Sequence, residues 1–307
     1  MLEIKLIILS ATAFGAAYLC TPLTIPLCKL IGAIDMPDGV RKINTVPIPR
    51  LGGLAFFTTC FFILLPFART SAYLGALLSG GAVIVAGGVA DDVFGISPFL
   101  KLFIQISAAL VTITFIPMPS EFSFFGILKI PLSGFFGFIF VITRLIFTIN
   151  AINFSDGLDG LASGLSVAAL ISLSLYGLAN SNTVPALAAL VLASSVLGFL
   201  PYNKYRAKIF MGDSGSQFLG LAIAILSLGC SKGGNFTVET SLFLAVPTID
   251  TVLSVTRRLI KRKSPFIADK GHLHHILLDA GVPHPLAVNI LIAFSALIAS
   301  LTLLITL

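Results

Sequence analysis

The chain has 307 residues, of which 57% are hydrophobic and only 10% are charged, and its formal net charge is +6. A soluble globular protein carries roughly 25% charged residues, so this composition excludes a water-soluble fold. Every polar stretch is shorter than roughly 40 residues, which is too short for an independent hydrophobic core. The four cysteines lie in or beside apolar segments without metal-ligand spacing, which argues against a disulfide framework or a zinc site.

Apolar runs recur along the chain at about the 20-residue length that crosses a bilayer as a helix. We predict ten such spans, at residues 6–27, 52–67, 72–90, 100–116, 132–149, 161–179, 184–200, 217–230, 242–259 and 286–307. The first run is longer than the apolar part of a signal peptide and lacks a small-x-small cleavage site, so we interpret it as a span. No internal repeat or linker divides the chain. We therefore expect one all-α, polytopic membrane domain over residues 1–307.

Charged residues are distributed unevenly between the two sides of the predicted membrane domain. The loops that follow the odd-numbered spans hold 14 of the 19 basic residues. Cytoplasmic loops carry an excess of Lys and Arg, so we expect this side to be cytoplasmic and both termini to lie on the other side. Ten of the 13 acidic residues also fall on this side or in the helix that leads to it. The rule does not account for acids, so we expect an active site on the cytoplasmic loops of a plasma-membrane protein.

The first acidic motif is Asp91-Asp92, at the Gly-rich end of the third span. Adjacent carboxylates at a membrane boundary repel each other and resist desolvation, so they are costly unless a cation or a base uses them. We interpret them as a magnesium ligand and a general base side by side, and the alternative is a solvated helix cap. Lys101, nine residues beyond Asp92, either reaches back to a phosphate or simply extends to the membrane surface.

The second motif is the densest polar stretch of the chain. Its two amides, two carboxylates and two glycines are Asn150, Asn153, Asp156, Asp159, Gly157 and Gly160. If the sixth span begins here, Asp156 and Asp159 share one face of its first turn, where negative charge suits the helix dipole. The glycines allow a ligand to approach the backbone closely. Helix capping by Asp156 would explain one carboxylate but not the whole set.

A third motif precedes the eighth span. Three cations, Lys204, Arg206 and Lys208, come before Asp213, which begins an Asp-Ser pair flanked by glycines. Cations followed by such a pair at a helix N-terminus suit an anion or a metal-bound phosphate. We interpret Asp213 as a metal ligand, with a helix N-cap as the alternative.

The last motif lies in the longest polar loop, between the ninth and tenth spans. A basic run over residues 257–263 is typical of the cytoplasmic side of a membrane protein, and His272, His274 and His275 follow it. As zinc ligands these histidines lack a fourth partner nearby, whereas as donors to a pyrophosphate they need none. We therefore interpret them as anion-binding residues.

Two further polar residues are placed outside the site. Asp250 follows Pro247 in the ninth span, and we interpret it as an ion-pair partner of Arg257 or Arg258 rather than a metal ligand. His284, between two prolines, is interpreted as an ordinary loop residue.

In this order, the motifs resemble those of the polyprenyl-phosphate N-acetylhexosamine-1-phosphate transferases, glycosyl transferase family 4. The resemblance covers nearly the whole chain and is carried by residues 41–42, 49–53, 91–92, 150–160, 210–215, 247–258 and 272–275. Each segment alone is a weak pattern, but all of them in sequence between the predicted spans are highly specific.

The resemblance implies transfer of a sugar-1-phosphate from a UDP-sugar to undecaprenyl phosphate, with release of UMP. It implies Mg²⁺ as cofactor, for which Mn²⁺ would substitute. The implied partners are a UDP-N-acetylhexosamine, undecaprenyl phosphate, membrane lipid and a second copy of the chain in a homodimer, with no nucleic acid. The product would start a lipid-linked cell-envelope glycan, such as a wall polymer or O-antigen lipopolysaccharide.

The resemblance also implies roles for individual residues. The implied catalytic residues are Asp91, Asp92, Asp213, His272, His274 and His275. Among these, Asp213 and Asp92 would bind the metal, Asp91 with Asp92 would bind or deprotonate the lipid phosphate, and the histidines would contact the sugar pyrophosphate. The implied substrate-binding residues are Arg41, Lys42, Arg50, Lys101, Asn150, Asn153, Asp156, Gly157, Leu158, Asp159, Asn203 and Phe210.

The chain departs from the family at two places, and two other protein classes share some of its features. Position 95 is Gly where some members have a third acid, so we do not expect it to bind metal. The His-Leu-His-His motif differs from the uninterrupted triplet of the phospho-MurNAc-pentapeptide transferases, which favours UDP-GlcNAc or a related donor over UDP-MurNAc-pentapeptide. An ion-coupled transporter would need acids near the bilayer midplane. An isoprenoid transferase would explain the aspartates but not the histidines.

Overall fold

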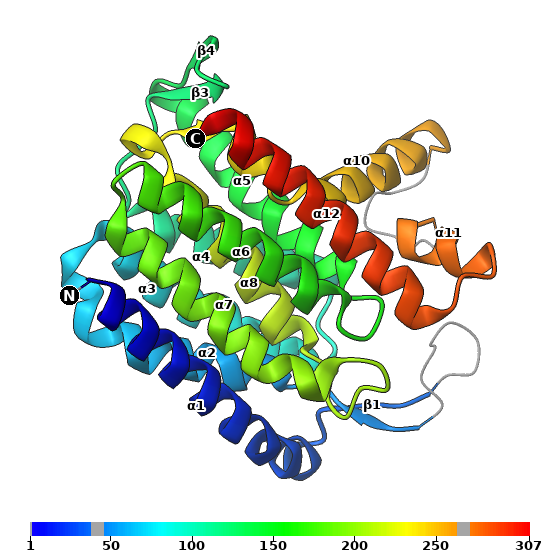
Figure 1. Ribbon diagram of the computed structural model, residues 1–307. Coiled ribbons are helices and arrows are strands. Elements are labelled where there is room, and N and C mark those ends of the chain that lie inside the picture. Colours follow the sequence, from blue (N-terminus) through cyan, green and yellow to red (C-terminus); the bar gives the residue numbers. More distant parts are fainter. Residues whose placement is uncertain (1, 38–45, 263–270) are drawn as a thin grey trace.

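The computed structural model describes residues 2–37, 46–262 and 271–307, and most of them form helices (Figure 1). The substrate-binding residues predicted at Arg41 and Lys42 lie outside the described residues. The longer helices are α1 (Leu2–Ile31), α2 (Gly52–Leu64), α3 (Ala72–Phe94), α4 (Pro98–Ile113), α5 (Gly134–Ser155), α6 (Leu161–Ala179), α7 (Thr183–Asn203), α8 (Gly212–Cys230), α10 (Ala245–Ile260) and α12 (His284–Thr306). The shorter elements are β1 (Ile34–Asp35), β2 (Ile48–Pro49), β3 (Glu121–Phe124), β4 (Leu128–Pro131), β5 (Phe236–Thr237), α9 (Val238–Leu242) and α11 (Leu273–Asp279).

Helices occupy all ten predicted spans, although the ninth is divided between two of them, and the all-α polytopic fold is confirmed. Within the described residues, eight helical segments are long and apolar enough to cross a bilayer. Helix α4 is apolar but only 16 residues long. It still connects the two ends of the bundle, because its first turn carries Lys101, which lines the pocket described below, and the strands β3 and β4 follow its other end.

The ninth predicted span, 242–259, is divided into α9 and α10. Proline lacks a backbone N–H and is tolerated in the first turn of a helix but not in its interior. Pro247 occupies the first turn of α10, and Phe243 and Leu244 separate the two helices. One continuous helix would place Pro247 in its interior, so the chain breaks immediately before α10.

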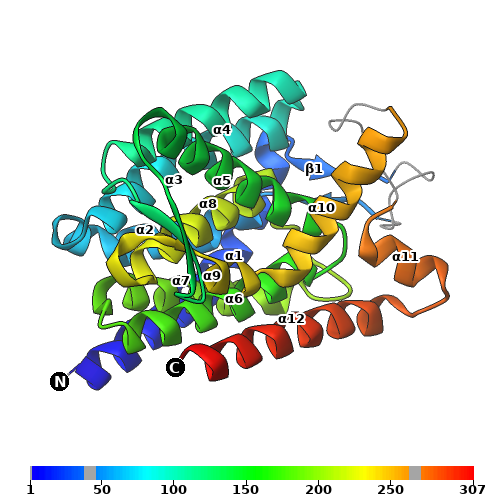
Figure 2. The same cartoon turned by 90° about the horizontal axis from the view of Figure 1, so that it is seen from above.

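Helix α8 lies at the centre of the bundle (Figures 1 and 2), and its residues from Ser214 to Cys230 are all buried. It begins at Gly212, five residues before the predicted start at 217. Two glycines allow α2 and α3 to approach its first turn. A Cβ on Gly88 would lie 2.6 Å from Ser214 N, and a Cβ on Gly53 would collide with Gly215. Small residues at helix contacts in membrane proteins permit such close backbone packing.

The two ends of the bundle differ in what they carry. Figure 1 shows both chain termini at the end where β3 and β4 protrude, whereas β1 and α11 lie at the opposite end. The buried apolar residues form one large cluster and a smaller one, in which Leu158 and Leu161 pack against Val246 and Leu291. This smaller cluster joins the start of α6 to α10 and α12, and it supports the loops that form the site.

Candidate active site

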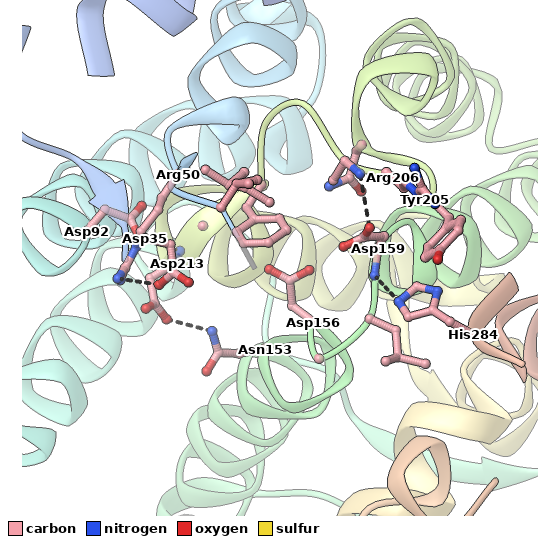
Figure 3. Close-up of a pocket in the computed structure, with 18 of the residues that line it drawn as sticks. Asp35, Arg50, Asp92, Asn153, Asp156, Asp159, Tyr205, Arg206, Asp213 and His284 are labelled. Atoms are coloured by element: carbon pink, nitrogen blue, oxygen red, sulfur yellow. Dashed lines mark hydrogen bonds and ion pairs between the residues drawn. The ribbon is translucent and has the colours of Figure 1, made fainter. Parts of the chain in front are cut away.

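A pocket of about 890 Å³ opens at the end of the bundle that carries β1 and α11 (Figure 3). Its lining residues are Asp35, Val46, Ile48, Arg50, Asp92, Lys101, Asn153, Asp156, Gly157, Leu158, Asp159, Asn203, Tyr205, Arg206, Ala207, Phe210, Gly212, Asp213, His275 and His284. They come from loops and helix ends that are far apart in the sequence. The expectation that the motifs gather at one side of the membrane domain is therefore consistent with the fold.

Asp92, on α3, caps a different helix. Its Oδ1 accepts the backbone N–H of Asp213 at 2.9 Å, and its Oδ2 accepts that of Ser214 at 3.0 Å. The first N–H groups of a helix have no intrahelical partner, and a carboxylate that accepts them also suits the helix dipole. Gly212 has φ +72°, and a Cβ there would lie 2.5 Å from Asp92 Oδ2. Asp92 therefore fixes the position of Asp213, and the cap explains why α8 begins before the apolar run.

Two cations link the carboxylates at this end of the pocket. Lys101 Nζ lies 2.5 Å from Asp91 Oδ2 and 3.2 Å from Asp213 Oδ1. Arg50 donates to Asp35 at 3.3 Å, and its other terminal nitrogen lies 3.5 Å from Asp92 Oδ1. Asp91 is buried behind the pocket wall, and its Oδ1 accepts the N–H of Ile96 at 3.0 Å. The predicted phosphate contact Lys101 is thus placed between two predicted catalytic acids.

Asp213 is held in place by amide side chains. Asn153 Nδ2 donates to its Oδ1 at 2.6 Å, and Gln217 Nε2 donates to the same oxygen at 3.2 Å. Gln217 accepts from Gln105 at 3.2 Å, and Gln105 accepts from Asn150 at 2.8 Å. These amides form a chain across α4, α5 and α8. Asn153, Gln217 and Lys101 all contact Oδ1 of Asp213, and none of them contacts its Oδ2.

These hydrogen-bonded amides change our interpretation of Asn150. The sequence suggested a substrate-binding amide, but the side chain bonds to Gln105 and to the carbonyl of Ile146 at 2.8 Å, and it does not line the pocket. Gln105 and Gln217 are almost fully buried, and sequence reasoning did not identify either. A polar residue inside an apolar helix was the available signal.

The Asp156–Gly160 stretch is a turn between α5 and α6, not the first turn of α6, which begins at Leu161. The expectation that Asp156 and Asp159 share a helical face is therefore wrong. Gly160, with φ +78°, allows the chain to reverse before α6 begins. Asp156 points into the pocket between the two ends (Figure 3). Burial, with the charges of Asp213, Asp92 and Asp159, raises the pKa of Asp156 to about 8.

Asp159 joins the Asp156–Gly160 turn to the loop that follows α7. Its Oδ2 accepts the N–H of Ala207 at 3.0 Å, and its own N–H donates to His284 Nε2 at 3.3 Å. The Tyr205 and His284 rings lie 4.8 Å apart, and the Arg206 guanidinium lies 6.0 Å from the Tyr205 ring. His284, which we interpreted as an ordinary loop residue, thus forms the wall at this end of the pocket. Its position at the start of a helix was a signal that sequence reasoning did not use.

The predicted substrate-binding residues Asn203, which ends α7, and Phe210, which follows it, are positioned by hydrogen bonds. Asn203 is buried, accepts from Ser163 at 2.6 Å and donates to the Ile209 carbonyl at 3.2 Å. Phe210 donates its N–H to Pro49 and accepts from Gly52, at 2.7 and 2.9 Å. Both residues line the pocket.

The three histidines have different environments. His275 lines the pocket, whereas His272 and His274 are buried beside it. The His272 and His274 rings are stacked with centroids 5.6 Å apart, and a Cβ on Gly157 would meet the His274 ring. Burial, with the neighbouring histidines, lowers the pKa of His274 to about 4, so this ring is neutral. A neutral buried ring suits packing under the Asp156–Gly160 turn.

Asp250 has a partner that we did not expect. Its Oδ2 lies 2.8 Å from His272 Nδ1, and its Oδ1 accepts the N–H of Leu273 at 2.7 Å. Arg258 Nη2 lies 3.5 Å from the other ring nitrogen of His272. Asp250 therefore caps α11 from α10, as Asp92 caps α8 from α3. We had instead expected an ion pair with Arg257 or Arg258.

The structure brings together twelve of the predicted site residues as lining residues of this pocket. They are Arg50, Asp92, Lys101, Asn153, Asp156, Gly157, Leu158, Asp159, Asn203, Phe210, Asp213 and His275. Four others lie behind the wall or beside it, namely Asp91, Asn150, His272 and His274. Sequence reasoning missed Asp35, Tyr205 and His284, and it placed Arg206 only among loop cations.

The donor set suits Mg²⁺ only in a particular way. Among the described residues, no three His, Cys, Asp or Glu side chains are placed to hold a metal ion together. Mg²⁺ usually binds through one or two carboxylates plus waters and substrate phosphates, so a smaller set is enough. Asp213 offers Oδ2, and Asp156 offers a carboxylate in a locally acidic environment. Asp92 uses both its oxygens on α8, so it fits a metal less well than Asp213 does.

The fold and this pocket define a multi-pass membrane protein with a pocket lined by charged residues at one end of its helical bundle. The family model for glycosyl transferase family 4 matches residues 74–231. A probable undecaprenyl-phosphate N-acetylglucosaminyl 1-phosphate transferase from Bacillus subtilis (strain 168) is 33% identical over 94% of this chain and 81% of its own length. The chain therefore belongs to glycosyl transferase family 4, and it is a transferase.

Two further relatives cover similar shares of the chain. The decaprenyl-phosphate N-acetylglucosaminephosphotransferase of Mycobacterium leprae (strain TN) is 33% identical over 96% of this chain and 82% of its own length. The undecaprenyl-phosphate alpha-N-acetylglucosaminyl 1-phosphate transferase of Escherichia coli (strain K12) is 30% identical over 90% of this chain and 77% of its own length. The family resemblance drawn from the motifs is thus confirmed.

Proposed function

We propose that the protein transfers N-acetylglucosamine-1-phosphate from UDP-N-acetylglucosamine to a polyprenyl phosphate, with undecaprenyl phosphate as the acceptor, and releases UMP. The relatives described above are named as N-acetylglucosaminyl 1-phosphate transferases or N-acetylglucosaminephosphotransferases of undecaprenyl or decaprenyl phosphate, which supports the transferred group and the acceptor. The observation that carries the proposal is the pocket itself. It collects Arg50, Lys101 and several carboxylates at one end of a membrane-spanning bundle, where a lipid phosphate and a soluble nucleotide can meet. Its volume lies within the range of small-molecule sites, roughly 300–1,000 Å³.

In the proposed reaction, an oxygen of the lipid phosphate attacks the sugar-linked phosphorus of the donor. The bond from this phosphorus to the bridging oxygen breaks, and UMP leaves with that oxygen. Lys101 bridges Asp91 and Asp213, and turning its ammonium toward the substrate phosphates would stabilise their charge. The Asp91 carboxylate would then be free to accept the proton of a singly protonated lipid phosphate.

A covalent aspartyl-phosphate route is the alternative to direct attack. It predicts that donor alone, without lipid acceptor, releases UMP and transfers the sugar-1-phosphate to an aspartate of the enzyme. Trapping a labelled phosphoenzyme under those conditions would contradict direct attack.

The donor is proposed to lie along the pocket with its pyrophosphate near Asp213 and its base near Asn203 and Phe210. His275 would contact the pyrophosphate from α11. Gly157 leaves the backbone of the Asp156–Gly160 turn open to the ligand. Asp159 would act as a brace for this arrangement, because its carboxylate is already bonded to Ala207.

We include Mg²⁺ as the cofactor of this reaction, held by Asp213 with Asp156. When bound, it would neutralise charge on the pyrophosphate and on the departing UMP. The pocket side is proposed to be cytoplasmic, since basic residues concentrate there. A homodimer and a role in starting cell-envelope glycans remain predictions from the family.

The deciding experiment measures UMP release by the purified protein in lipid nanodiscs. We expect release from UDP-N-acetylglucosamine only when undecaprenyl phosphate and Mg²⁺ are both present, and not from UDP-MurNAc-pentapeptide. Asp213→Asn should abolish release while leaving the thermal unfolding transition in place. Absence of release with every UDP-N-acetylhexosamine tested would refute the proposal, and near-normal turnover by Asp213→Asn would remove Asp213 from the site.

A further inference from the structure

The β3–β4 hairpin, at the end of the bundle opposite the pocket, has one apolar face and one polar face. Its antiparallel register pairs Phe122 with Ile130, Ser123 with Lys129, and Phe124 with Leu128. Directly opposed residues in such a pair project from the same face, and alternate residues along a strand share a face. The apolar face therefore consists of Phe122, Phe124, Leu128 and Ile130. The polar face consists of Glu121, Ser123 and Lys129.

The apolar face points toward the membrane-spanning bundle. The Phe122 ring lies 5.6 Å from the ring of Phe140, which is in the second turn of α5. Phe124 continues the same face, with its ring 4.9 Å from Phe122. On the other face, Lys129 forms an ion pair with Glu121 at 2.8 Å. Because α5 spans the membrane, the apolar face is directed to the membrane side and the ion pair away from it.

Only the inner part of the apolar face is covered by the bundle. Phe122 is partly buried and packs against the core, whereas Phe124, Leu128 and Ile130 are 36%, 57% and 46% exposed. Ile127, at the tip, is 90% exposed. Figure 1 shows the hairpin protruding beyond the helix ends. An exposed apolar patch of this kind, with polar residues on the reverse, is typical of an interaction surface.

The surface next to the hairpin identifies what it contacts. Phe135 and Phe136, in the first turn of α5, are 73% and 83% exposed and follow β4 directly in the chain. Since α5 is long and apolar enough to cross the membrane, we expect these exposed apolar rings to lie against lipid at the end of the span. The apolar face of the hairpin continues this lipid-facing surface.

We propose that the β3–β4 hairpin is a membrane-interface anchor. Its apolar face rests on the acyl chains of the leaflet opposite the pocket, and Lys129, on its polar face, reaches water with its partner Glu121. A polar face on one side and an apolar face on the other is the pattern of peptide elements that lie in the plane of a bilayer surface. Strand β3 also pairs with β5, which leads into α9 and the broken ninth crossing. Lipid contact therefore holds the ends of α5 and of this crossing at one depth.

The test uses the fact that the chain has no tryptophan. Leu128→Trp and Lys129→Trp each introduce a single tryptophan. The two positions are adjacent in the sequence, but Leu128 is on the apolar face of the hairpin and Lys129 is on its polar face. Both variants are reconstituted in phosphatidylcholine vesicles that contain lipids brominated along the acyl chain, and quenching by these lipids and by aqueous acrylamide is measured. Both substitutions lie far from the pocket, and UMP release gives an independent check that the protein is folded.

We expect brominated lipid to quench Leu128→Trp several-fold more than Lys129→Trp, and acrylamide to show the reverse order. Equal quenching of both variants by acrylamide, with none by brominated lipid, would overturn the proposal. So would protection of Leu128→Trp from both quenchers, because the face would then be covered by protein, such as a second copy of the chain. If a variant is inactive and unfolded, Ile127→Trp replaces it as the reporter of the apolar tip. These outcomes do not depend on which substrate the enzyme uses.

Discussion

Asp92 uses both carboxylate oxygens on the backbone of α8, so its first role is to position Asp213. In Asp92→Asn, the amide keeps one acceptor and turns its NH₂ group toward a backbone N–H. We expect activity to fall sharply and the free energy of unfolding to fall by about 1 kcal/mol, as for a lost helix cap. UMP release and thermal unfolding measure the two effects.

Asp91→Asn is the matched control for this prediction. Asp91 accepts the backbone N–H of Ile96 rather than one at the start of α8, so we expect the unfolding transition to move less. An Asp92→Asn variant that loses activity with an unchanged unfolding transition would instead make Asp92 a group that acts on the substrate.

The buried amides of α4, α5 and α8 determine which oxygen of Asp213 faces the pocket. Gln105→Leu removes the central member and leaves Asn150 and Gln217 without their shared partner. Residues that orient metal ligands typically change metal affinity or activity by about 10–100-fold, and we expect a loss in this range together with a higher Mg²⁺ requirement. A Mg²⁺ titration of UMP release measures it. Lower stability with an unchanged Mg²⁺ requirement would show that the network is only structural.

Two helix starts near the pocket are fixed by side chains from other helices. Asp92 on α3 caps α8, and Asp250 on α10 caps α11. Neither α8 nor α11 has a side-chain cap of its own at its N-cap residue. The two helices that carry Asp213 and His275 toward the pocket are therefore positioned by contacts distant in sequence.

The contact of α11 with the Asp156–Gly160 turn gives a prediction at this scale. In Gly157→Ala, the new Cβ would lie 2.7 Å from Cε1 of His274, so this buried ring must shift, and we expect α11 to shift with it. Overpacking of this kind costs about 1–3 kcal/mol, and we expect a higher KM for the UDP-sugar because His275 moves with the helix. Gly15→Ala in α1 is the control, since its Cβ meets open space. Equal KM values for Gly157→Ala and the parent protein would separate α11 from substrate binding.

At the scale of the whole molecule, apolar runs of bilayer length were sufficient to predict the helical fold. They were not sufficient where one residue changes the local structure. Pro247 divides the ninth span, and the cap from Asp92 starts α8 at Gly212, five residues early. The β3–β4 hairpin was not predicted, because two strands of four residues between apolar helices give only a short alternating pattern.

The candidate site was predictable to the level of which loops meet, because its motifs carry charge that the membrane excludes. What each side chain contacts was not. Asn150 lies three residues from Asn153 in the sequence, yet only Asn153 reaches the pocket. The rings of His284 and Tyr205 pack together, although helices α8 to α11 lie between these residues in the sequence. Such pairs depend on the relative placement of helices, which local patterns do not encode.

The arrangement of the ends predicts the orientation of the whole protein. The pocket end carries Lys204, Arg206, Lys208, Lys261 and Arg262, and both termini lie at the hairpin end. The positive-inside rule then places the pocket in the cytoplasm and the termini outside. Alkaline phosphatase is active only when exported, so a fusion after Leu307 should be active and a fusion after Lys261 inactive. A fusion in the α6–α7 loop, after Asn182, is the second exported control. The reverse pattern would place the pocket on the outer side, where a cytoplasmic UDP-sugar could not reach it.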